Sequence, residues 1–401
     1  MHRTSYVLLT IGLAACSTDP NVQQPTAPDA QLTLSKHQDE VEYRITKLEP
    51  LDGPFVRGSG LTSRGWGVGH ASHATGAIHA VLWRHDRVKD LGSLGGEEHS
   101  SAVQWRGINS RGMVVGISYT GTPHTLGGTW SCKAFIASKG TTCVGFVWDN
   151  GVMSALPTLG GDNGFAAAVN ERGQVVGWAE TAMVDPTCDA PQRLGFKAVR
   201  WEPRKGKRSV LRPLPGDAAS AATAINERGQ AVGISGECDV AVGRFSAKRA
   251  VLWDEHGRPS EIPNLGGEAW HTPMAINDRG DVAGFGNPPG GTGLAPTLNG
   301  WVWTGGSRVV RILPLEGHTS GQARGINNRR QVVGISSGPG GSSAIIWENG
   351  RARDLNSLVT PSLDRLISAQ DITNDGEIIG SMIEASTGRV IGYVATPVRR
   401  R

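Results

Sequence analysis

A ten-residue motif recurs along this chain at intervals of 46 to 61 residues. It consists of a small residue, an apolar residue, Asn, two polar residues, Gly, and then a β-branched pair and a closing Gly, as in residues 168–177. Five copies are headed by Asn, and two weaker copies carry Thr in its place: Thr62, Asn109, Asn170, Asn226, Asn277, Asn327 and Thr373. A repeat of this length is typical of folds in which one small unit is stacked many times.

Two further motifs follow each copy. The first is a small residue, two further residues that are mostly apolar, and Trp, at residues 80–83, 145–148, 198–201, 250–253, 300–303 and 344–347; the seventh copy, 392–395, lacks the Trp. The second is an apolar strand that ends in Leu-Gly-Gly or Leu-Pro, at residues 88–96, 153–161, 210–216, 261–267 and 309–315. Each unit therefore predicts four short strands separated by turns.

The fold class follows from how these strands can bury their side chains. The Asn-x-x-Gly segment favours a hairpin turn, because Asn bonds its own backbone and Gly adopts the left-handed conformation. The strands are apolar on both faces, so both faces of each sheet must be covered. Gly makes up 56 of 401 residues, which leaves little room for long helices. We therefore predict an all-β protein, a β-propeller of seven four-stranded blades. A count of six or eight would need a missed or a false repeat.

The ends of the repeat region predict how the ring closes. Residues 43–48 look like a third-motif strand with no unit before them, and the last unit lacks such a strand. We expect the N-terminal strand to complete the last blade, which removes the free sheet edges.

These repeats resemble the HAF family of extracellular repeat proteins. The family signature combines the Ala-x-x-Trp strand, Leu-Gly-x-Leu-Gly-Gly and Ile-Asn-x-x-Gly-x-Val-Val-Gly, and the resemblance covers roughly residues 43–396. It implies export and a repeat fold, but no particular reaction or ligand.

The N-terminal segment predicts that the protein is exported from the cytoplasm. A short apolar stretch follows Arg3 and ends in Leu13-Ala14-Ala15-Cys16, which resembles the bacterial lipobox. The resemblance implies cleavage before Cys16, acylation of that residue and, because Ser17 follows it, an outer-membrane lipoprotein facing the periplasm or the cell surface. An ordinary secretory signal is the alternative. We expect a signal peptide over 1–15, a tether over 16–42, the propeller over 43–398 and a basic tail over 399–401.

Four cysteines remain after Cys16, and all fall in insertions between two motifs. An even number in an exported chain predicts disulfides, and four cysteines allow three connectivities. We favour Cys132–Cys143 and Cys188–Cys238. There is no Cys-x-x-Cys pair, and we expect no metal and no cofactor.

The loops after the Leu-Gly-Gly strands lead toward the axis on one face. They carry carboxylates, imidazoles and one indole, a set that suits a carbohydrate or a cation. The candidate ligand-binding residues are Glu97, His99, Asp162, Asp217, Glu268, Trp270, His271, Glu316 and His318. The alternative is that these polar residues only solvate turns.

Arginine occupies the same place in six of the seven Asn-x-x-Gly turns. If those turns ring the channel on the opposite face, that mouth is positive and binds an anion. The candidate anion-binding residues are Arg64, Arg111, Arg172, Arg228, Arg279 and Arg329. The alternative is that they are solvated members of the repeat.

The sequence favours a binding role over catalysis. It contains no nucleophile elbow, phosphate loop or His-Glu-x-x-His. The net charge is only +4, and aromatic residues do not alternate with basic ones as in nucleic-acid readers. We therefore predict a monomeric, membrane-anchored platform for a glycan or a protein. The alternatives are a polysaccharide-active enzyme using Glu97, Asp162, Asp217 and Glu268 with His99 or His271, and a purely structural envelope protein.

Overall fold

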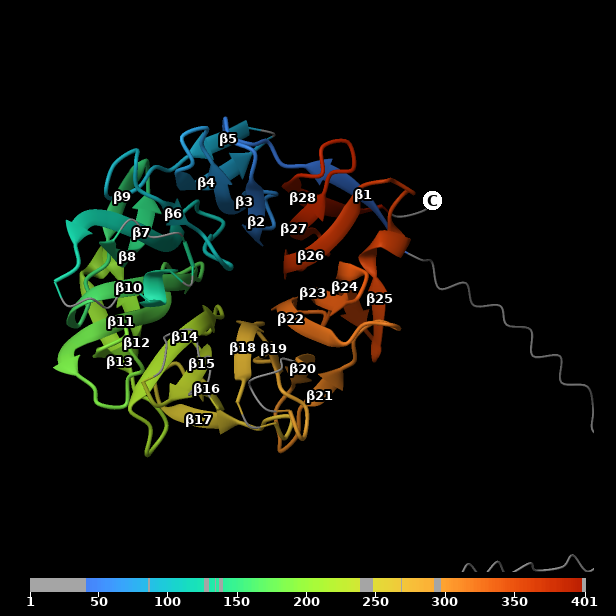
Figure 1. Ribbon diagram of the computed structural model, residues 1–401. Coiled ribbons are helices and arrows are strands. Elements are labelled where there is room, and N and C mark those ends of the chain that lie inside the picture. Colours follow the sequence, from blue (N-terminus) through green and yellow to red (C-terminus); the bar gives the residue numbers. More distant parts are fainter. Residues whose placement is uncertain are drawn as a thin grey trace, which may run out of the picture. The chain divides into compact units, whose positions relative to one another are not determined.

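A computed structural model describes residues 41–85, 87–125, 130–133, 135–136, 140–238, 248–267, 269–291 and 297–398. These residues form seven four-stranded antiparallel sheets that stand in a ring (Figure 1). The sequence prediction of a seven-bladed β-propeller is therefore confirmed. No helix among the described residues is long and apolar enough to span a membrane.

The first four blades follow one another along the chain. Blade 1 contains β2 (Val56–Leu61), β3 (Gly67–Ser72), β4 (Ile78–Arg84) and β5 (Arg87–Asp90). Blade 2 contains β6 (Ser101–Ala102), β7 (Val114–Pro123), β8 (Thr141–Asp149) and β9 (Val152–Ala155). Blade 3 contains β10 (Gly160–Val169), β11 (Val175–Val184), β12 (Leu194–Glu202) and β13 (Lys207–Leu211). Blade 4 contains β14 (Ala219–Ile225), β15 (Ala231–Gly236), β16 (Arg249–Trp253) and β17 (Pro259–Ile262).

The last three blades complete the ring. Blade 5 contains β18 (His271–Ile276), β19 (Val282–Gly286), β20 (Asn299–Trp303) and β21 (Val310–Ile312). Blade 6 contains β22 (Ser320–Ile326), β23 (Val332–Gly338), β24 (Gly341–Glu348) and β25 (Arg351–Asp354). Blade 7 contains β26 (Arg365–Ile372), β27 (Ile378–Ile383), β28 (Val390–Val398) and the N-terminal strand β1 (Glu42–Lys47). Short helical turns occur at α1 (Trp130–Lys133), Pro203–Lys205 and Leu355–Leu358.

The ring closes through strands from the two ends of the propeller. β1 pairs antiparallel with β28, from Glu42 opposite Val398 to Lys47 opposite Tyr393. The chain therefore returns to its start, as the sequence predicted, and the fourth strand of blade 7 comes from its N-terminal side. This pairing covers the edge of β28, which would otherwise be open to association with another sheet.

The hydrophobic core lies between the blades, as the two-sided apolar pattern predicted. Seven buried clusters each join two neighbouring blades. In β7, for example, Val114 packs toward blade 1 and Val115 toward blade 3, because successive side chains of a strand point to opposite faces.

Three of the repeated Trp residues tie their blade to the preceding one near the outer rim. The indole N–H of Trp83 donates to the carbonyl of Glu49 at 2.8 Å, and that of Trp201 donates to Pro157 at 3.0 Å. Trp253 makes the same bond to Arg212 at 2.7 Å. Each acceptor lies just after the outermost strand of the preceding blade, so these indoles combine apolar burial with a directed bond.

The turn asparagines tie the blades together near the axis. Each Oδ1 accepts two backbone N–H groups of its own turn, and each Nδ2 donates to the backbone carbonyl at the same place in the next turn. The second bond is 3.0–3.1 Å long from Asn109 to Asn170, Asn170 to Asn226, Asn226 to Asn277, Asn277 to Asn327 and Asn327 to Thr373. The asparagines therefore form a chain of bonds that runs through six blades.

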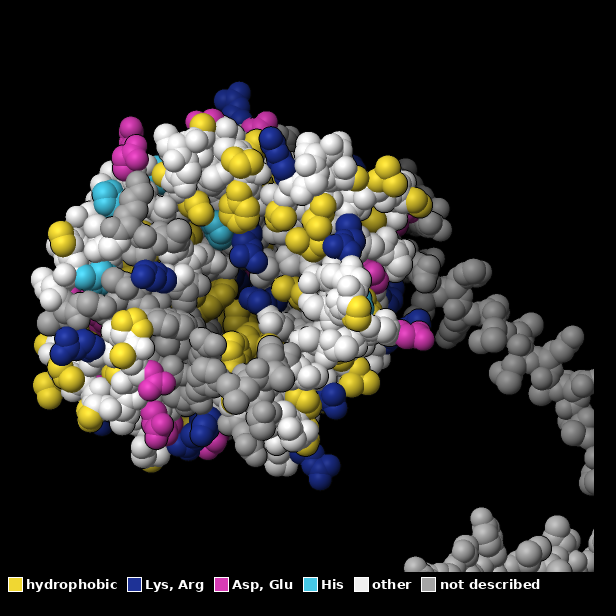
Figure 2. Space-filling view, viewed as in Figure 1, with side chains coloured by type: hydrophobic (Ala, Val, Ile, Leu, Met, Phe, Trp, Pro, Cys, Tyr) yellow, Lys and Arg dark blue, Asp and Glu magenta, His cyan; other side chains and the backbone are white. Residues whose placement is uncertain are grey.

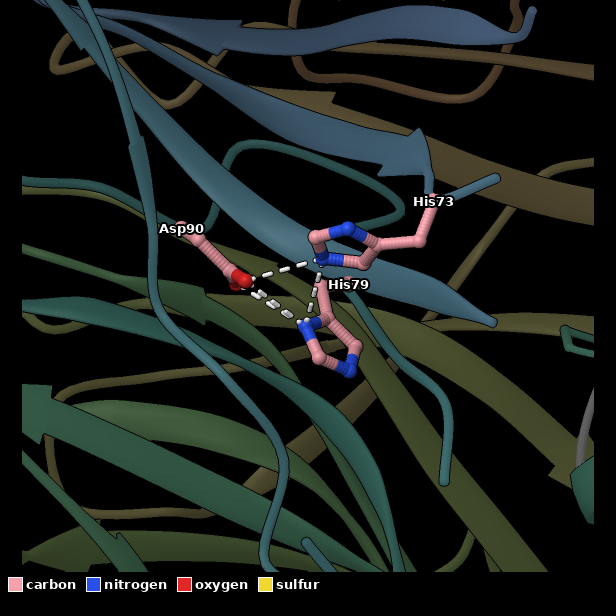
Figure 3. Close-up of side chains that lie close together, drawn as sticks. All are labelled: His73, His79 and Asp90. Atoms are coloured by element: carbon pink, nitrogen blue, oxygen red, sulfur yellow. Dashed lines mark hydrogen bonds and ion pairs between the residues drawn. The ribbon is translucent and has the colours of Figure 1, made fainter. Parts of the chain in front are cut away.

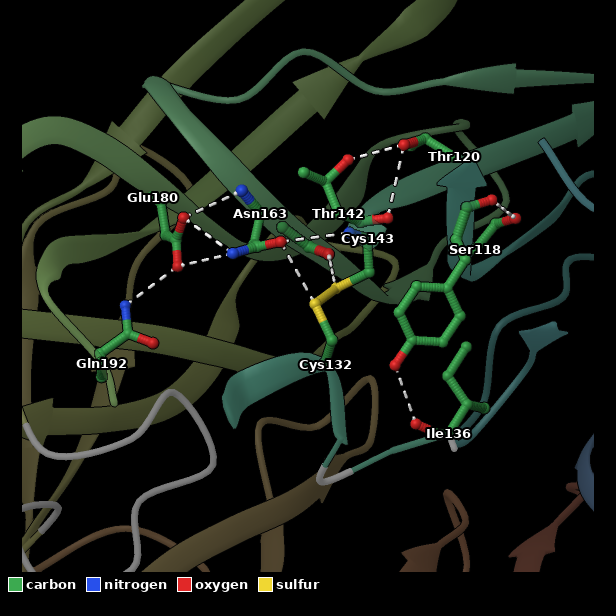
Figure 4. The surroundings of a disulfide bond; sticks show 11 residues. Ser118, Thr120, Cys132, Ile136, Thr142, Cys143, Asn163, Glu180 and Gln192 are labelled. Carbon is green, nitrogen blue, oxygen red and sulfur yellow. Dashed lines mark hydrogen bonds between the residues drawn. A yellow bond between two sulfur atoms is a disulfide. The ribbon is translucent and has the colours of Figure 1, made fainter. Parts of the chain in front are cut away.

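Both disulfides favoured by the sequence are confirmed. Cys132 is bonded to Cys143 and Cys188 to Cys238. Figure 4 shows the first bridge beside the buried Asn163 side chain, which donates to Glu180 at 3.1 Å.

We predict that Asn226→Ala destabilises the propeller by about 2–3 kcal/mol, because it removes two turn bonds and leaves the buried Asn277 carbonyl without its donor. The denaturant midpoint measures this loss. Arg228→Ala, an exposed change in the same turn, is the matched control and should stay within about 0.5 kcal/mol of the parent protein. Equal midpoints for the two variants would contradict a structural role for the asparagine chain.

Candidate functional site: the axial cavity

A small irregularity in the innermost strands turns side chains toward the channel axis. In six of the described inner strands the pairing register skips one residue, which lies three places before the turn Asn or Thr. The skipped residues are Ser59, Ala167, Thr223, Met274, Arg324 and Gln370. Such bulges commonly redirect a side chain next to a binding site.

These strands surround a cavity of about 310 Å³ at the axis. Figure 2 looks into the central hollow and shows basic and apolar side chains inside it. The aromatic residues of the lining are Trp105, Phe135, Trp178, Trp270 and Phe285. The polar and charged residues of the lining are Arg57, Gln104, Thr223, Thr272, Arg324 and Gln370.

The insertion that carries the first disulfide brings Phe135 to this cavity. The Gln104 side chain donates to the Phe135 carbonyl at 2.6 Å, and the Tyr119 hydroxyl donates to the Ile136 carbonyl at 3.0 Å. Phe135 stands edge-on to Trp105, with ring centroids 5.7 Å apart. The Cys132–Cys143 bridge closes the insertion and packs in the same buried cluster as Phe135 and Trp105, so it helps to fix an aromatic wall of the cavity.

Arg57 and Arg324 give the cavity a positive charge. Among the described residues, no ion pair joins either guanidinium to a carboxylate. Arg324 donates to the Gln322 side chain and lies 5.8 Å from the ring centre of Phe285, while its buried Nε has no hydrogen-bond partner in the part of the chain described. Burial lowers the pKa of Arg57; burial and repulsion from Arg57 lower the pKa of Arg324 to about 10.

This arrangement is chemically suited to an anion that also has an apolar face. Two desolvated guanidinium groups form strong charge-assisted bonds with a carboxylate, sulfate or phosphate group. The half-buried rings of Trp105, Phe135 and Trp270 can stack against the C–H face of a sugar ring. The described lining contains no Asp, Glu or His, so it does not supply the pair of carboxylates that a glycoside-cleaving mechanism needs.

The central channel opens on the side of the Asn-x-x-Gly turns at a mouth whose lining carries both acidic and basic residues. It is not the positive ring that the sequence suggested. Its charged lining residues are Arg106, Glu171, Glu227, Asp278, Arg324 and Asp371. Burial, together with the charges of Glu171 and Asp278, raises the pKa of Glu227. At four of the five turn Asn residues, the next residue lines the mouth and accepts a backbone N–H of the preceding turn, as Glu227 does from Glu171 N at 3.0 Å.

The six turn arginines lie outside this lining. All six are exposed: Arg64, Arg111, Arg172, Arg228, Arg279 and Arg329. Arg172, Arg228 and Arg329 run sideways along the face and approach the glycine of the next turn. They stand one residue further along the turn than the residues that face the channel, so the turn geometry directs them away from the mouth.

Of the loop residues that the sequence singled out, Trp270 lines the axial cavity, where its ring centre is 5.9 Å from that of Phe285. Glu97 and Glu316 are exposed, and His99 is half-buried. Asp162 accepts a bond from Thr125, Asp217 pairs with Arg249, and His318 bonds Ser336. Glu268 lies outside the described residues. The lining therefore holds one of the described candidates.

His271 belongs to the core of blade 5. Its side chain is buried, stacks on Trp301 with ring centres 4.6 Å apart, and bonds the Pro263 carbonyl at 2.9 Å. Burial lowers its pKa to about 4, so this imidazole is neutral at neutral pH.

The residues that sequence reasoning missed carry a recognisable signal. Five of the lining residues occupy two positions of the repeat, counted back from the Asn or Thr of the turn. The position five residues before it holds Arg57, Gln104 and Thr272, and the position three residues before it holds Arg324 and Gln370. These two positions vary in size and charge from unit to unit, although the residues around them keep the repeat pattern.

Two groups of described residues bring potential metal donors together. One is Asp185 with Cys188 and Cys238, whose sulfur atoms form a disulfide and do not serve as thiolate ligands. The other is His73, His79 and Asp90 in blade 1 (Figure 3), which the sequence did not single out.

The similarity of this chain to known proteins is confined to solved structures. No protein-family model and no curated protein matches the chain. Among solved structures, the chain is similar to a streptogramin B lyase, with 9% identity, 89% of this chain and 98% of that chain covered, and a TM-score of 0.49. It is also similar to an oligogalacturonate lyase in complex with manganese, with 10% identity, 89% of this chain and 96% of that chain covered, and a TM-score of 0.46. A third similar structure is an Aleuria aurantia lectin, with 10% identity, 81% of this chain and 99% of that chain covered, and a TM-score of 0.36. At such low identity these likenesses concern the fold alone.

We predict that stability falls as the pH drops from about 6.5 toward 4, because unfolded His271 binds a proton in this range that folded His271 excludes. This residue contributes up to about 3 kcal/mol to the change. Denaturant midpoints at several pH values measure it. His271→Gln should flatten the slope, whereas His256→Gln, at an exposed site, should not. An unchanged slope in His271→Gln would contradict the buried neutral histidine.

Proposed function

We propose that this protein is an exported, lipid-anchored binding platform of the cell envelope that holds an anionic glycan in its axial cavity. The observation that carries the proposal is the presence of Arg57 and Arg324 in an aromatic-lined cavity, with no carboxylate partner among the described residues. Burying a charge without a partner costs free energy, and a bound anion would recover it.

The size of the cavity favours a sugar residue over a folded protein surface. A volume of about 310 Å³ lies at the lower end of the range for small-molecule sites. Aromatic walls with a few convergent polar groups are also the usual composition of such sites. A purely structural envelope role leaves the two unpaired arginines without an explanation.

The proposed cellular location of the protein depends on its sequence. The HAF-type repeats and the lipobox-like Leu13-Ala14-Ala15-Cys16 both imply export, and the two disulfides are consistent with an oxidising compartment. Acylation at Cys16 would place the propeller at a membrane surface, where envelope polysaccharides are within reach.

We predict that the purified protein binds uronic acid, sulfated or phosphorylated glycans on an array and binds their neutral counterparts weakly. Arg57→Gln or Arg324→Gln should lower affinity about 10–100-fold, the effect of losing a charge-assisted bond, and Trp270→Ala should lower it as well. Arg329→Gln and Trp66→Ala are matched controls outside the cavity.

Stability measurements separate a binding role from a structural one. If Arg324 serves a ligand, Arg324→Met should raise the thermal midpoint while it weakens binding as much as Arg324→Gln does, because it removes a charge that has no carboxylate partner. Equal binding of neutral glycans, or a cleaved polysaccharide product, would contradict the proposal; the second result would favour the enzyme alternative.

We predict that Cys16→Ala releases the protein from the membrane fraction and abolishes incorporation of labelled fatty acid. Ser17→Asp is the matched variant: it should keep the acyl chains but shift the protein toward the inner membrane. Fractionation followed by immunoblotting measures both. Retention of Cys16→Ala in the membrane would show that lipid is not the anchor.

A further inference from the structure

Three potential metal donors converge on the side of blade 1, away from the axial cavity. His73 lies in the loop between β3 and β4, His79 lies on β4, and Asp90 ends β5 (Figure 3). His73 Nε2 is 3.2 Å from His79 Nδ1 and 2.9 Å from Asp90 Oδ2, and His79 Nδ1 is 2.9 Å from the same oxygen. The three atoms thus form a nearly equilateral triangle.

The remaining ring nitrogens determine which atoms of the triangle carry lone pairs. His79 Nε2 lies 3.1 Å from the backbone carbonyl of His99, which can only accept, so Nε2 carries the proton. His73 Nδ1 lies 2.7 Å from a carboxylate oxygen of Asp52, which fixes the proton there in the same way. Neutral imidazoles in these tautomers point two lone pairs at each other and at a carboxylate, an arrangement that only a cation can stabilise.

We propose that His73, His79 and Asp90 bind a divalent transition-metal ion, with zinc as the best fit to this donor set. Tetrahedral zinc with bonds of about 2.0–2.1 Å separates its ligand atoms by about 3.3 Å, close to the observed triangle. Asp52 and the His99 carbonyl then act as the outer partners that orient metal-binding imidazoles in proteins.

The donor set and its exposure define the kind of site. Two imidazole nitrogens and one carboxylate select zinc and its neighbours over magnesium or calcium, which prefer oxygen ligands alone. The His79 side chain is 3% exposed, but those of His73 and Asp90 are 24% and 34% exposed. One side of the triangle therefore faces solvent, which leaves a fourth position for water or an external ligand.

A metal ion bound by this cluster would also affect how the ring is held closed. Asp52 lies in the connection from β1 to β2, the segment that links the closing strand of blade 7 to blade 1. That connection already bonds blade 1 through Gly53 N to Ser72 O at 3.0 Å. A bound ion would fasten His73, and through it Asp52, to the outer strands of blade 1, beside the point where the ring closes.

A proton is the competing cation. Burial acts against a charged imidazole, but the hydrogen bond and the charge of Asp90 outweigh it and raise the pKa of His79. A shared proton would satisfy part of the triangle, so the experiment must separate a metal ion from an imidazolium–carboxylate pair.

The test uses the full-length protein, purified without a histidine tag, stripped with a chelator and dialysed. Titration calorimetry with Zn²⁺ should give one site per chain, and Zn²⁺ should raise the thermal midpoint. His73→Ala and Asp90→Asn should abolish both effects. Asp52→Asn, which alters only an outer partner, should weaken binding about 10–100-fold. Co²⁺ should give visible absorption bands typical of a four-coordinate site with nitrogen ligands in the parent protein and lose them in His73→Ala.

His256→Ala, an exposed histidine in another blade, is the control and should bind Zn²⁺ like the parent protein. Circular dichroism checks that each variant is folded, and His73→Ala, whose side chain is partly exposed, remains informative if Asp90→Asn unfolds. Absence of Zn²⁺ binding to the folded parent protein would overturn the proposal in favour of the proton. Equal Zn²⁺ affinity in the parent protein and His73→Ala would overturn it as well.

Discussion

The bond from each turn Asn to the backbone of the next turn is the interaction on which the ring depends. Apolar burial between blades is large but has no direction, so it does not by itself fix how one sheet is turned against the next. The Asn bond recurs with nearly the same length, 3.0–3.1 Å, near the axis, and the indole N–H bonds of Trp83, Trp201 and Trp253 act near the outer rim. Between blades 2 and 3 and between blades 3 and 4, where both bonds occur, the two directed bonds at different radii define the angle between the blades.

The asparagine chain is interrupted where the ring closes, and other groups replace it there. The side chains of Thr62 and Thr373 make bonds only within their own turns. Across this seam the buried carboxylate of Asp371 accepts from Leu61 N at 3.0 Å and lies 3.7 Å from Arg106. Burial raises the pKa of Asp371, so this contact is less favourable than an amide bond. The pairing of β1 with β28 adds the main-chain bonds that hold the last blade to the N-terminal strand.

The repeats made most of the fold predictable. They fix the turn Asn, the two-sided strands and the Trp positions, and each of these has the same physical role in several blades. The candidate site was predictable only at Trp270. Polar residues after Leu-Gly-Gly drew attention because loops usually carry binding groups, but His271 and Asp217 are occupied by local bonds. Arg57 and Arg324 lie within strands, and only a register shift at the bulge, which depends on pairing between strands, turns Arg324 to the axis.

The two proposed sites arise in the same way. Each occurs where the side chains of a unit differ from the repeat pattern while the strands and the bonds between blades are kept. A guanidinium held at the axis without a carboxylate opposes folding, and the apolar burial and directed bonds between the blades offset that cost. The same framework holds His73, His79 and Asp90 from three separate segments of blade 1 at distances of 2.9–3.2 Å. The bonds that recur between units thus leave a few positions free to carry side chains that the repeat itself does not require.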